Sequence, residues 1–559
     1  MKNEKSILSK KRIAILCSVV AVVSTIIFIP QIRELIMMFG DRIARKTIDR
    51  NVWSQKLILW EVQFLCILAF IFFLMFAKID SFIKTNYVSW LLVVVFSAVL
   101  IALAFQSSDI WVDETFSLGL ARHSVKDLIS LTAQDVHPPL YYLILKAGLA
   151  FKPNSVFLAR IISVIPVIII LCVSVVFFSK EFSSICATVF NLILVCTSSV
   201  FEYAVEIRMY SWAMLFCMLC CVFSYYIIKN GSFRYFLFYG IAAVCGAYCQ
   251  YWTAVALAIN FILTSILYFA KYKKVKNIIL TALIGILLYL PWIPIAIKQF
   301  SSVTESYWIP PITIKTFIGY VLAVIPFSNK VKIIALFMVA VLFVKNVKCC
   351  TKKDKNSFFP MICLLTPFFL IMCATAISLA TRPIFTSKYA VPTIVFMIFY
   401  ITTGFYDVGF QSKRLSFIFL LGIALFSINA VNNFKYERNN SRKYNEFTEI
   451  MRENLSDDTV FVFSQNIDSH IPTCLAYLFP KNRICGFSMS KLFADVLFYD
   501  LDNFIDSCDG EADVCLVLNA DETPPDVFSD SNCYLLNIGG YPLNKFCFLK
   551  TNTGRFTAH

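Results

Sequence analysis

The chain has 559 residues, of which 59% are apolar and only 15% are charged. Soluble domains are on average about 25% charged, so this composition excludes an ordinary soluble protein. The large number of Phe residues, 55 against only 16 Gly, excludes a disordered or fibrous chain. A net charge of +15 would suit a nucleic-acid-binding protein only if the charge gathered on one soluble face, so its location decides its meaning.

Long apolar runs fill the chain up to residue 431. A helix needs roughly 20 mainly apolar residues to cross a bilayer. The fold class predicted is therefore an α-helical polytopic membrane protein with about thirteen transmembrane helices, near residues 13–30, 57–77, 87–105, 156–178, 183–200, 207–228, 233–248, 251–270, 277–296, 331–346, 357–380, 388–406 and 414–431. Because no small-residue cleavage site follows 13–30, this run is expected to be an uncleaved anchor.

The basic loops predict the orientation of these helices, since Lys and Arg collect in short cytoplasmic loops. Basic residues cluster at 2–12, 271–276, 345–355 and 407–414. All four clusters face the cytoplasm if the apolar run 139–151 is too short to cross and only dips into the outer leaflet. The N-terminus is then cytoplasmic and the C-terminus extracytoplasmic. The basic 31–56 loop falls outside by the same parity, and an interfacial amphipathic helix is one interpretation of it.

The last 120 or so residues have a different pattern. Short β-like runs at 459–463 and 514–518 alternate with helix-like stretches, which predicts one small extracytoplasmic α/β domain. This segment holds six cysteines, and an external compartment permits disulfides. Cys515, however, lies in a strand-like apolar run where a packed thiol fits equally well, so pairing stays open.

The charge divides along the same boundary. Residues 437–559 contain 10 Lys and Arg against 18 Asp and Glu, a net −8, whereas residues 1–436 contain 40 against 17, a net +23. Much of the basic excess is therefore an orientation signal, and no nucleic-acid partner is expected.

The loop 106–155 is the richest polar stretch of the membrane half. Asp113 and Glu114 are adjacent carboxylates just after a span, beside the interfacial residue Trp111. Acids at a membrane surface are costly unless they are paired or useful. Asp113 is either a catalytic base or a solvated acid or N-cap of a helix over 114–121. Asp135 and His137 follow, and the His-Pro-Pro run could simply cap a short helix.

The remaining polar clusters fall at predicted outer helix ends. An Arg there either snorkels for structural reasons or binds a phosphate with its guanidinium. Their shared side predicts an outward-facing site made of the clusters Glu206, Arg208 and Tyr210; Tyr248 and Gln250; and Arg382, Lys388 and Tyr389.

Seven motifs occur together in order: DIWVDETFS, DVHPPLYYLILK, EIRMYS, YCQY, YLPWIP, YWIPP and RPIFTSKYAVP. This set resembles the GT-C membrane glycosyltransferases, in the branch of bacterial relatives of protein O-mannosyltransferases and lipid A aminoarabinose transferases. The resemblance covers about 87–431. It implies a GT-C catalytic module over 87–435 with a first external loop at 106–155, two additional helices in 1–86, and a soluble extracytoplasmic α/β domain over 436–559.

The resemblance implies transfer of a sugar from a polyprenyl-phosphate donor to an extracytoplasmic glycan, lipid or protein acceptor at the plasma membrane. A carboxylate can act as general base on the acceptor hydroxyl, and attack on the anomeric carbon then inverts its configuration. Asp113 is the expected base, and Glu114 is expected to orient it or the acceptor.

The resemblance also implies the substrate-binding residues. Asp135 and His137 are expected to position the donor sugar, and Arg208, Tyr210, Arg382 and Lys388 to bind its phosphate. The further substrate-binding residues expected are Tyr141, Glu206, Tyr248, Gln250 and Tyr389. The family often has His at the position of Gln250 and Arg at that of Lys388. Gln250 cannot titrate and therefore receives no acid/base role, and Lys388 keeps the charge without the bidentate fork.

No cofactor is expected. Asp113, Glu114, Asp135 and His137 are hard ligands for a divalent metal, but no spaced metal motif supports one. The alternatives are a transporter or flippase of lipid-linked sugars, which would show internal repeats or Gly- and Pro-broken helices, and a ligase or polymerase of lipid-linked glycans. A catalytically dead scaffold that binds cell-wall polymer would not need the paired acids and cations.

Overall fold

The computed structural model describes residues 86–106, 110–305, 309, 311–327, 332–350, 358–408, 432, 435–436, 439, 442–463, 470–482, 484–485, 513–524, 531–536 and 544–549. The expected spans at 13–30, 57–77 and 414–431 and the 31–56 loop lie outside these residues. The described chain forms two compact units. The first holds residues up to Ala104, Thr132–Tyr141 and Arg160 to residue 432, and the second holds Phe105–Leu131, Tyr142–Ala159 and the residues from Lys435 on.

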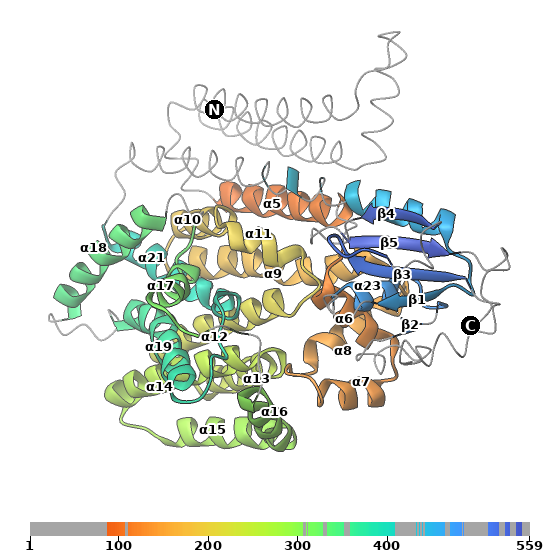
Figure 1. The fold of residues 1–559 in the computed structure, drawn as a ribbon. Helices are drawn as coiled ribbons and strands as arrows, with labels where there is room; N and C mark the ends of the chain where they lie inside the picture. Colours follow the sequence, from red (N-terminus) through yellow and green to blue (C-terminus); the bar gives the residue numbers. More distant parts are fainter. Residues whose placement is uncertain are drawn as a thin grey trace, which may run out of the picture. The chain divides into compact units, whose positions relative to one another are not determined.

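The first unit is helical. Its described helices, most of which are labelled in Figure 1, are α5 (Asn86–Gln106), α9 (Val156–Glu181), α10 (Ser184–Val195), α11 (Ser198–Val205), α12 (Tyr210–Asn230), α13 (Phe233–Cys249), α14 (Tyr251–Tyr272), α15 (Lys276–Tyr289), η1 (Leu290–Trp292), α16 (Ile293–Glu305), α17 (Ile314–Ala323), α18 (Lys332–Cys350), α19 (Phe359–Ala380), α20 (Ser387–Ala390), η3 (Val391–Thr393) and α21 (Ile394–Val408). Helix α12 packs on α13 and α14, and α19 packs on α14 and α21.

Six described helices are long and apolar enough to cross a membrane: Asn86–Gln106, Val156–Glu181, Tyr210–Asn230, Tyr251–Tyr272, Lys276–Ser301 and Phe359–Ala380. The protein is therefore a membrane protein with a helical core. The expected span 183–200 is instead a pair of helices, α10 and α11, bent by 71° at a break around Thr197. The count of thirteen spans remains a prediction, because it includes segments outside the described residues.

Asn260 is the centre of a hydrogen-bond network that joins four of these helices. Its Oδ1 accepts from Ser224 Oγ of α12 at 2.8 Å and from the Tyr239 hydroxyl of α13 at 3.1 Å. Its Nδ2 donates to Thr366 Oγ1 of α19 at 3.1 Å. The side chain is fully buried. Polar groups inside a bilayer must find partners within the protein, so this network fixes the register of α12, α13, α14 and α19.

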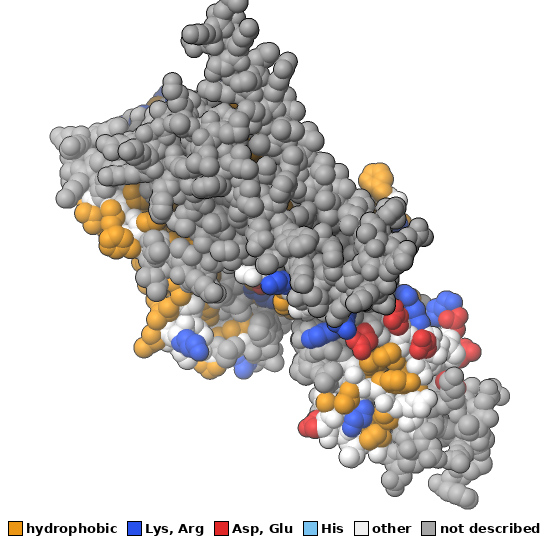
Figure 2. Space-filling view, turned by 90° about the horizontal axis from the view of Figure 1, so that it is seen from above, with side chains coloured by type: hydrophobic (Ala, Val, Ile, Leu, Met, Phe, Trp, Pro, Cys, Tyr) orange, Lys and Arg blue, Asp and Glu red, His pale blue; other side chains and the backbone are white. Residues whose placement is uncertain are grey.

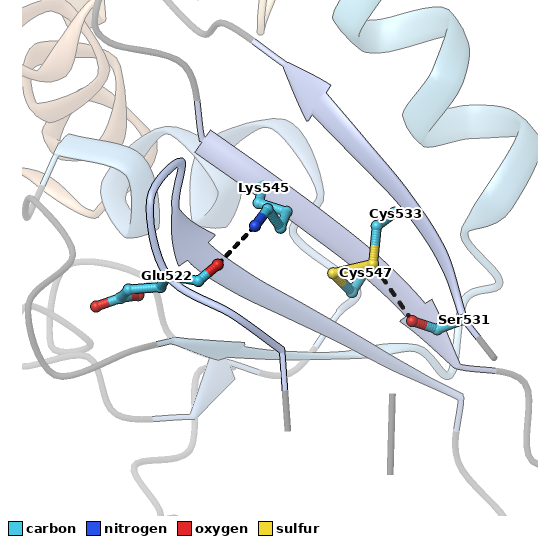
Figure 3. Close-up of a disulfide and its surroundings, with 5 residues drawn as sticks. All are labelled: Glu522, Ser531, Cys533, Lys545 and Cys547. Carbon is cyan, nitrogen blue, oxygen red and sulfur yellow. Dashed lines mark hydrogen bonds between the residues drawn. A yellow bond between two sulfur atoms is a disulfide. The ribbon is translucent and has the colours of Figure 1, made fainter. Parts of the chain in front are cut away.

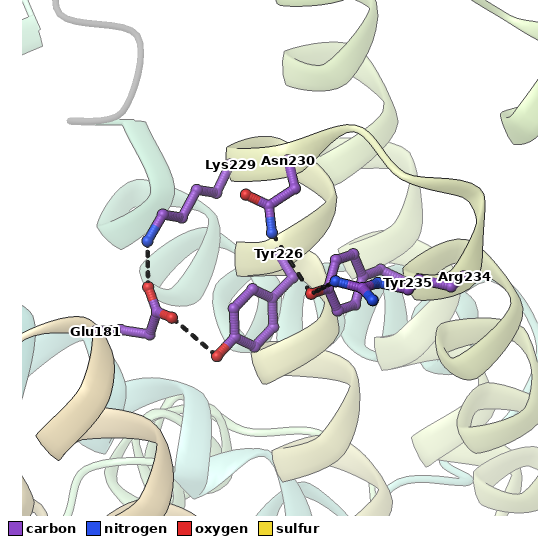
Figure 4. A network of polar contacts seen from close by, with 6 residues as sticks. All are labelled: Glu181, Tyr226, Lys229, Asn230, Arg234 and Tyr235. Carbon is purple, nitrogen blue, oxygen red and sulfur yellow. Dashed lines mark hydrogen bonds and ion pairs between the residues drawn. The ribbon is translucent and has the colours of Figure 1, made fainter.

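A second polar network marks one end of the helical unit (Figure 4). Glu181 at the end of α9 pairs with Lys229 and accepts from the Tyr226 hydroxyl at 3.0 Å, and Tyr235 accepts from Arg234 at 2.7 Å. The basic 271–276 loop lies at the same end, because the Tyr272 hydroxyl donates to the Lys229 carbonyl at 2.8 Å. Basic residues therefore gather where α13 begins, whereas Gln250 follows its other end.

Large apolar side chains cover much of the outer surface of the helices. Exposed ones include Ile266 of α14, Leu283 and Leu287 of α15, and Leu379 of α19. In the space-filling view, orange apolar side chains gather on one part of the described surface, whereas acidic and basic side chains intersperse on another (Figure 2). Contiguous apolar surface of this kind is expected of helices that face lipid.

The second unit contains a mixed sheet of five described strands: β1 (Val460–Phe463), β2 (Ile484–Cys485), β3 (Val514–Asn519), β4 (Asn532–Leu536) and β5 (Asn544–Leu549). Their order is β2-β1-β3-β5-β4, with β1 parallel to β2 and β3, and β5 antiparallel to β3 and β4. The strands expected at 459–463 and 514–518 are confirmed as β1 and β3. Helix α23 (His470–Leu478) connects β1 to β2.

Most of the segment 110–149 belongs to the same unit as the sheet. It forms α6 (Val112–Arg122), α7 (Val125–Thr132) and α8 (Leu140–Leu149). Helix α6 packs on α23: the Cys474 thiol lies 3.9 Å from Thr115 Oγ1, and the Arg122 guanidinium lies 4.2 Å from the centre of the Tyr477 ring. Helix α8 has 10 residues, too few to cross a bilayer, as the parity argument requires. The expected domain boundaries stay predictions, although residues 105–131 group with the tail.

A disulfide joins Cys533 of β4 to Cys547 of β5, which are directly opposed in the antiparallel ladder (Figure 3). Lys545 fastens the neighbouring loop by donating to the Glu522 carbonyl at 2.6 Å. Cys515 on β3 is a free, fully buried thiol. Burial raises the pKa of this thiol well above its usual value, because the thiolate would be poorly solvated.

We predict that the Gly246→Leu variant is destabilised by about 1–3 kcal/mol, the usual cost of overpacking. A Cβ added at Gly246 would lie 2.7 Å from Leu257 Cδ1 and 3.3 Å from Phe216 Cβ. Gly285→Leu is the matched control, since a Cβ there meets nothing within 4 Å. Thermal unfolding of the two purified variants measures the difference, and equal melting temperatures would contradict the tight packing of α13.

We predict that the tail cysteines differ in reactivity at neutral pH. Cys515 stays protonated and buried, so it should resist alkylation until the protein is denatured. Peptides with Cys533 and Cys547 should be linked before reduction and separate afterwards. Mass spectrometry of alkylated, digested protein measures both, and rapid alkylation of Cys515 in the native protein would refute the assignment.

Candidate functional site

A pocket of about 320 Å³ lies in the helical unit, where several helices begin or end. It brings together residues from four of the predicted motifs, His137, Gln250, Tyr289 and Tyr389, which are far apart in the chain. The other lining residues are Val136, Tyr251, Trp252, Ala254, Val255, Ala296, Gln299, Phe300, Ile377 and Ile384. A mainly apolar pocket with a few polar groups is typical of a small-molecule site.

Gln250 lies at the break between α13 and α14. Its backbone is extended, with φ −158° and ψ 134°, so α13 ends at Cys249 and α14 begins at Tyr251. The Gln250 Oε1 accepts from Thr253 Oγ1 at 2.6 Å, which orients the amide, and the side chain is 2% exposed. Among the described residues, Gln250 Nε2 and the Tyr289 hydroxyl, both buried, have no hydrogen-bond partner.

A chain of hydrogen bonds fixes the segment 132–141 beside the pocket. Trp292 Nε1 donates to the Tyr251 hydroxyl at 2.9 Å, and that hydroxyl donates to Gln299 Oε1. Gln299 Nε2 then donates to the Thr132 carbonyl at 2.8 Å, and the Asp135 amide donates to the same carbonyl at 3.1 Å. Asp135, half-buried, is thereby held in the turn that leads to His137.

Tyr389 lies between an imidazole and a cation. The His137 ring meets the Tyr389 ring edge-on at 6.4 Å between centroids, and Lys388 Nζ lies 6.0 Å from the centre of the same ring. The position of the 382–389 segment is set by the Tyr320 hydroxyl, which donates to the Phe385 carbonyl at 2.7 Å, and by Trp252, whose ring packs edge-on against Phe385. Arg382, half-buried, begins this segment.

Arg208 is almost fully buried in the turn between α11 and α12. Its amide donates to the Glu206 carbonyl at 2.7 Å, and the buried Tyr210 ring packs on Tyr203. Arg160, which the sequence reasoning missed, supports this turn: its Nη1 donates to the Val205 carbonyl at 3.2 Å. A charged residue early in an apolar helix was the signal that could have singled out Arg160.

Two predicted substrate residues have structural contacts instead. Tyr141 is fully buried, and its hydroxyl hydrogen-bonds Ser163 of α9 at 3.1 Å. The Tyr248 hydroxyl donates to the Leu288 carbonyl at 3.0 Å, and its ring packs on Tyr289. Neither side chain lines the pocket. Tyr289, the last residue of α15, and Gln299 of α16 do line it. Tyr289 begins the YLPWIP motif, whereas Gln299 carried no sequence signal.

Asp113 and Glu114 lie in the first turn of α6, in the second unit. Trp111 is the N-cap residue, so the interpretation of Asp113 as an N-cap is wrong. Glu114 is 2% exposed, and its Oε2 accepts from the Trp111 amide at 3.4 Å, reaching back over the helix start. Asp113 is half-buried, and its carbonyl accepts from Ser117 Oγ at 2.8 Å. Within the described residues, no three His, Cys, Asp or Glu gather as a metal site.

The fold is similar to that of two crystal structures of ArnT from Cupriavidus metallidurans, which confirms the resemblance seen in the motifs at the level of fold. The apo structure has a TM-score of 0.57 at 11% identity, over 83% of this chain and 98% of that one. The structure bound to undecaprenyl phosphate has a TM-score of 0.55 at 11% identity, over 84% and 98%. No protein-family model and no curated protein sequence matches the chain.

We predict that Glu114 stabilises α6 through its reach to the Trp111 amide. Glu114→Ala should lower stability by about 1 kcal/mol, a typical value for a lost helix cap. Glu114→Gln, which keeps an acceptor oxygen, should be close to wild type. Thermal unfolding of the purified variants compares the two, and equal stability of Glu114→Ala and Glu114→Gln would contradict the capping role.

Proposed function

We propose that the protein is a membrane glycosyltransferase that takes a sugar from a polyprenyl-phosphate donor and transfers it to an extracytoplasmic acceptor. The observation that carries the proposal is the pocket, where His137, Gln250 and Tyr389 come together from the DVHPP, YCQY and SKYAVP motifs. The fold supports it, since ArnT has the same fold and one of its crystal structures is bound to undecaprenyl phosphate.

Asp113 is the proposed general base. Its carboxylate takes the proton of an acceptor hydroxyl as that oxygen attacks the anomeric carbon. The bond from the anomeric carbon to the phosphate oxygen breaks in the same displacement, so the configuration inverts and polyprenyl phosphate leaves. Glu114 orders the helix turn that carries Asp113, through its contact with the Trp111 amide.

The cations of the helical unit are the proposed phosphate ligands. The leaving polyprenyl phosphate gains negative charge, which preorganised cations stabilise. Lys388 and Arg382 belong to the segment that ends at Tyr389 in the pocket wall, and Arg208 lies in the turn before α12. The proposal includes no metal or other cofactor.

The proposed location is the plasma membrane, with the sheet unit outside. Two features support this orientation. The basic loop 271–276 lies at the helix ends opposite the Gln250 break, as cytoplasmic loops do. The Cys533–Cys547 disulfide suits an oxidising external compartment. The acceptor is a hydroxyl-bearing glycan, lipid or protein.

We predict that Asp113→Asn lowers the rate of sugar transfer at least about 100-fold, the lower end of the range for a general base. Membranes with the variant are supplied with a radiolabelled polyprenyl-phosphate sugar, and label in the acceptor fraction is counted. Asp127→Asn, which changes an exposed acid of the same loop, is the matched control and should transfer normally.

Undiminished transfer by Asp113→Asn would remove Asp113 as the base. A transporter or flippase would give a different result: labelled lipid would change leaflet without label entering an acceptor. Reconstituted vesicles with acceptor on one side separate these outcomes.

A further inference from the structure

The described residues of the pocket wall offer no carboxylate to a cation. Of the fourteen described residues that line the pocket, none is Lys, Arg, Asp or Glu, and the one histidine is His137. Asp135 interacts electrostatically with Tyr251 but does not line the pocket. An ammonium group would lose its hydration there without a carboxylate among the lining residues, which is strongly unfavourable. The part of a ligand that enters this pocket is therefore expected to carry no ammonium group.

Two glutamines in the wall have opposite roles. Both amide atoms of Gln299 are hydrogen-bonded within the protein, since its Oε1 accepts from Tyr251 and its Nε2 donates to the Thr132 carbonyl. Only one amide atom of Gln250 is hydrogen-bonded: Oε1 accepts from Thr253, whereas Nε2 has no partner among the described residues. A buried donor without a partner is costly, so an acceptor oxygen of a ligand would be stabilising there. The Tyr289 hydroxyl offers a second such group.

Aromatic rings make up much of the remaining wall: Tyr251, Trp252, Tyr289, Phe300 and Tyr389. A sugar ring has an apolar C–H face that packs on an aromatic ring and hydroxyls at its edge that reach polar groups. A prenyl chain would also pack on these rings, but it would leave Gln250 Nε2 unpaired. The charged group of a donor fits outside the pocket, where Lys388 lies on the Tyr389 ring.

We infer that this pocket, with Gln250 Nε2 as the hydrogen-bond donor that faces the ligand, holds the sugar ring of the lipid-linked donor, and that this sugar carries no amino group. The inference rests on the proposed function and names its substrate class: hydroxyl-bearing sugars without an ammonium. Gln250 is then a specificity-determining residue, because its Nε2 donates to a hydroxyl oxygen and offers no charge to an ammonium.

Binding tests the inference without requiring transfer. Full-length protein in nanodiscs is titrated with three lipids: polyprenyl phosphate with a neutral hexose, the same lipid with an amino sugar, and sugar-free polyprenyl phosphate. The wild-type protein should bind the neutral hexosyl lipid about tenfold more tightly than either of the others, as one hydrogen bond to a buried group allows.

Two variants sharpen the test. Gln250→Leu should lose that advantage while binding sugar-free lipid as before. Gln250→Glu should shift the preference by about tenfold toward the amino-sugar lipid, because the new carboxylate pairs with the ammonium. Thr281→Val is the matched control: like Gln250→Leu it removes a buried polar group without a partner among the described residues, here a hydroxyl outside the pocket, and it should keep the wild-type preference.

Equal binding of the neutral and amino-sugar lipids by the wild-type protein would overturn the inference. So would an equal loss for hexosyl and sugar-free lipid in Gln250→Leu, since the pocket would then hold the prenyl chain or phosphate. Gln250-dependent binding of the neutral hexosyl lipid without transfer to any acceptor would support the inference and refute the proposed function. Transfer with no dependence on Gln250 would do the reverse.

Discussion

Every polar group inside a bilayer needs a hydrogen-bond partner within the protein. The helical unit depends on this constraint. Asn260 meets this need for four helices at once, through Ser224, Tyr239 and Thr366. Lipid offers no competing hydrogen bonds, so such a network holds the register of helices whose apolar surfaces could otherwise slide past one another. The same constraint gives an unpartnered buried amide a special meaning, because in this environment it is expected to serve a ligand.

The site is built by interruptions of helices. Gln250 separates α13 from α14, Pro291 lies in the short helix between α15 and α16, and the 381–386 segment separates α19 from α20. Polar or aromatic side chains at or near these interruptions, Gln250, Tyr289 and Tyr389 among them, line the pocket. Gln299 of α16 donates to the Thr132 carbonyl, so the turn that leads to His137 is positioned by a helix that is distant in the sequence.

The first turn of α6 shows that neighbouring acidic residues can have different roles. Asp113 and Glu114 are adjacent, yet the Glu114 carboxylate accepts a hydrogen bond from the Trp111 amide, whereas Asp113, half-buried, is not the N-cap of the helix. Helix α6 in turn packs on α23 of the tail, so the loop and the tail form one unit although some 300 residues separate them. The tail therefore supports the helix that carries the proposed base.

The sequence by itself determined the apolar spans, the short α8, the strands β1 and β3, and the motif residues His137, Gln250 and Tyr389, because hydrophobic length, alternation and motif spacing are local properties. It did not reveal the 71° bend between α10 and α11, since the apolar pattern continues through the break and the contact made there by the Phe327 amide, which donates to Thr197 Oγ1, comes from a distant part of the chain. The antiparallel place of β5, the structural contacts of Tyr141 and Tyr248, and the roles of Arg160, Tyr289 and Gln299 were likewise decided by tertiary structure. Each depends on which distant group comes within hydrogen-bonding or packing distance, and that distance is set only when the helices and strands assemble.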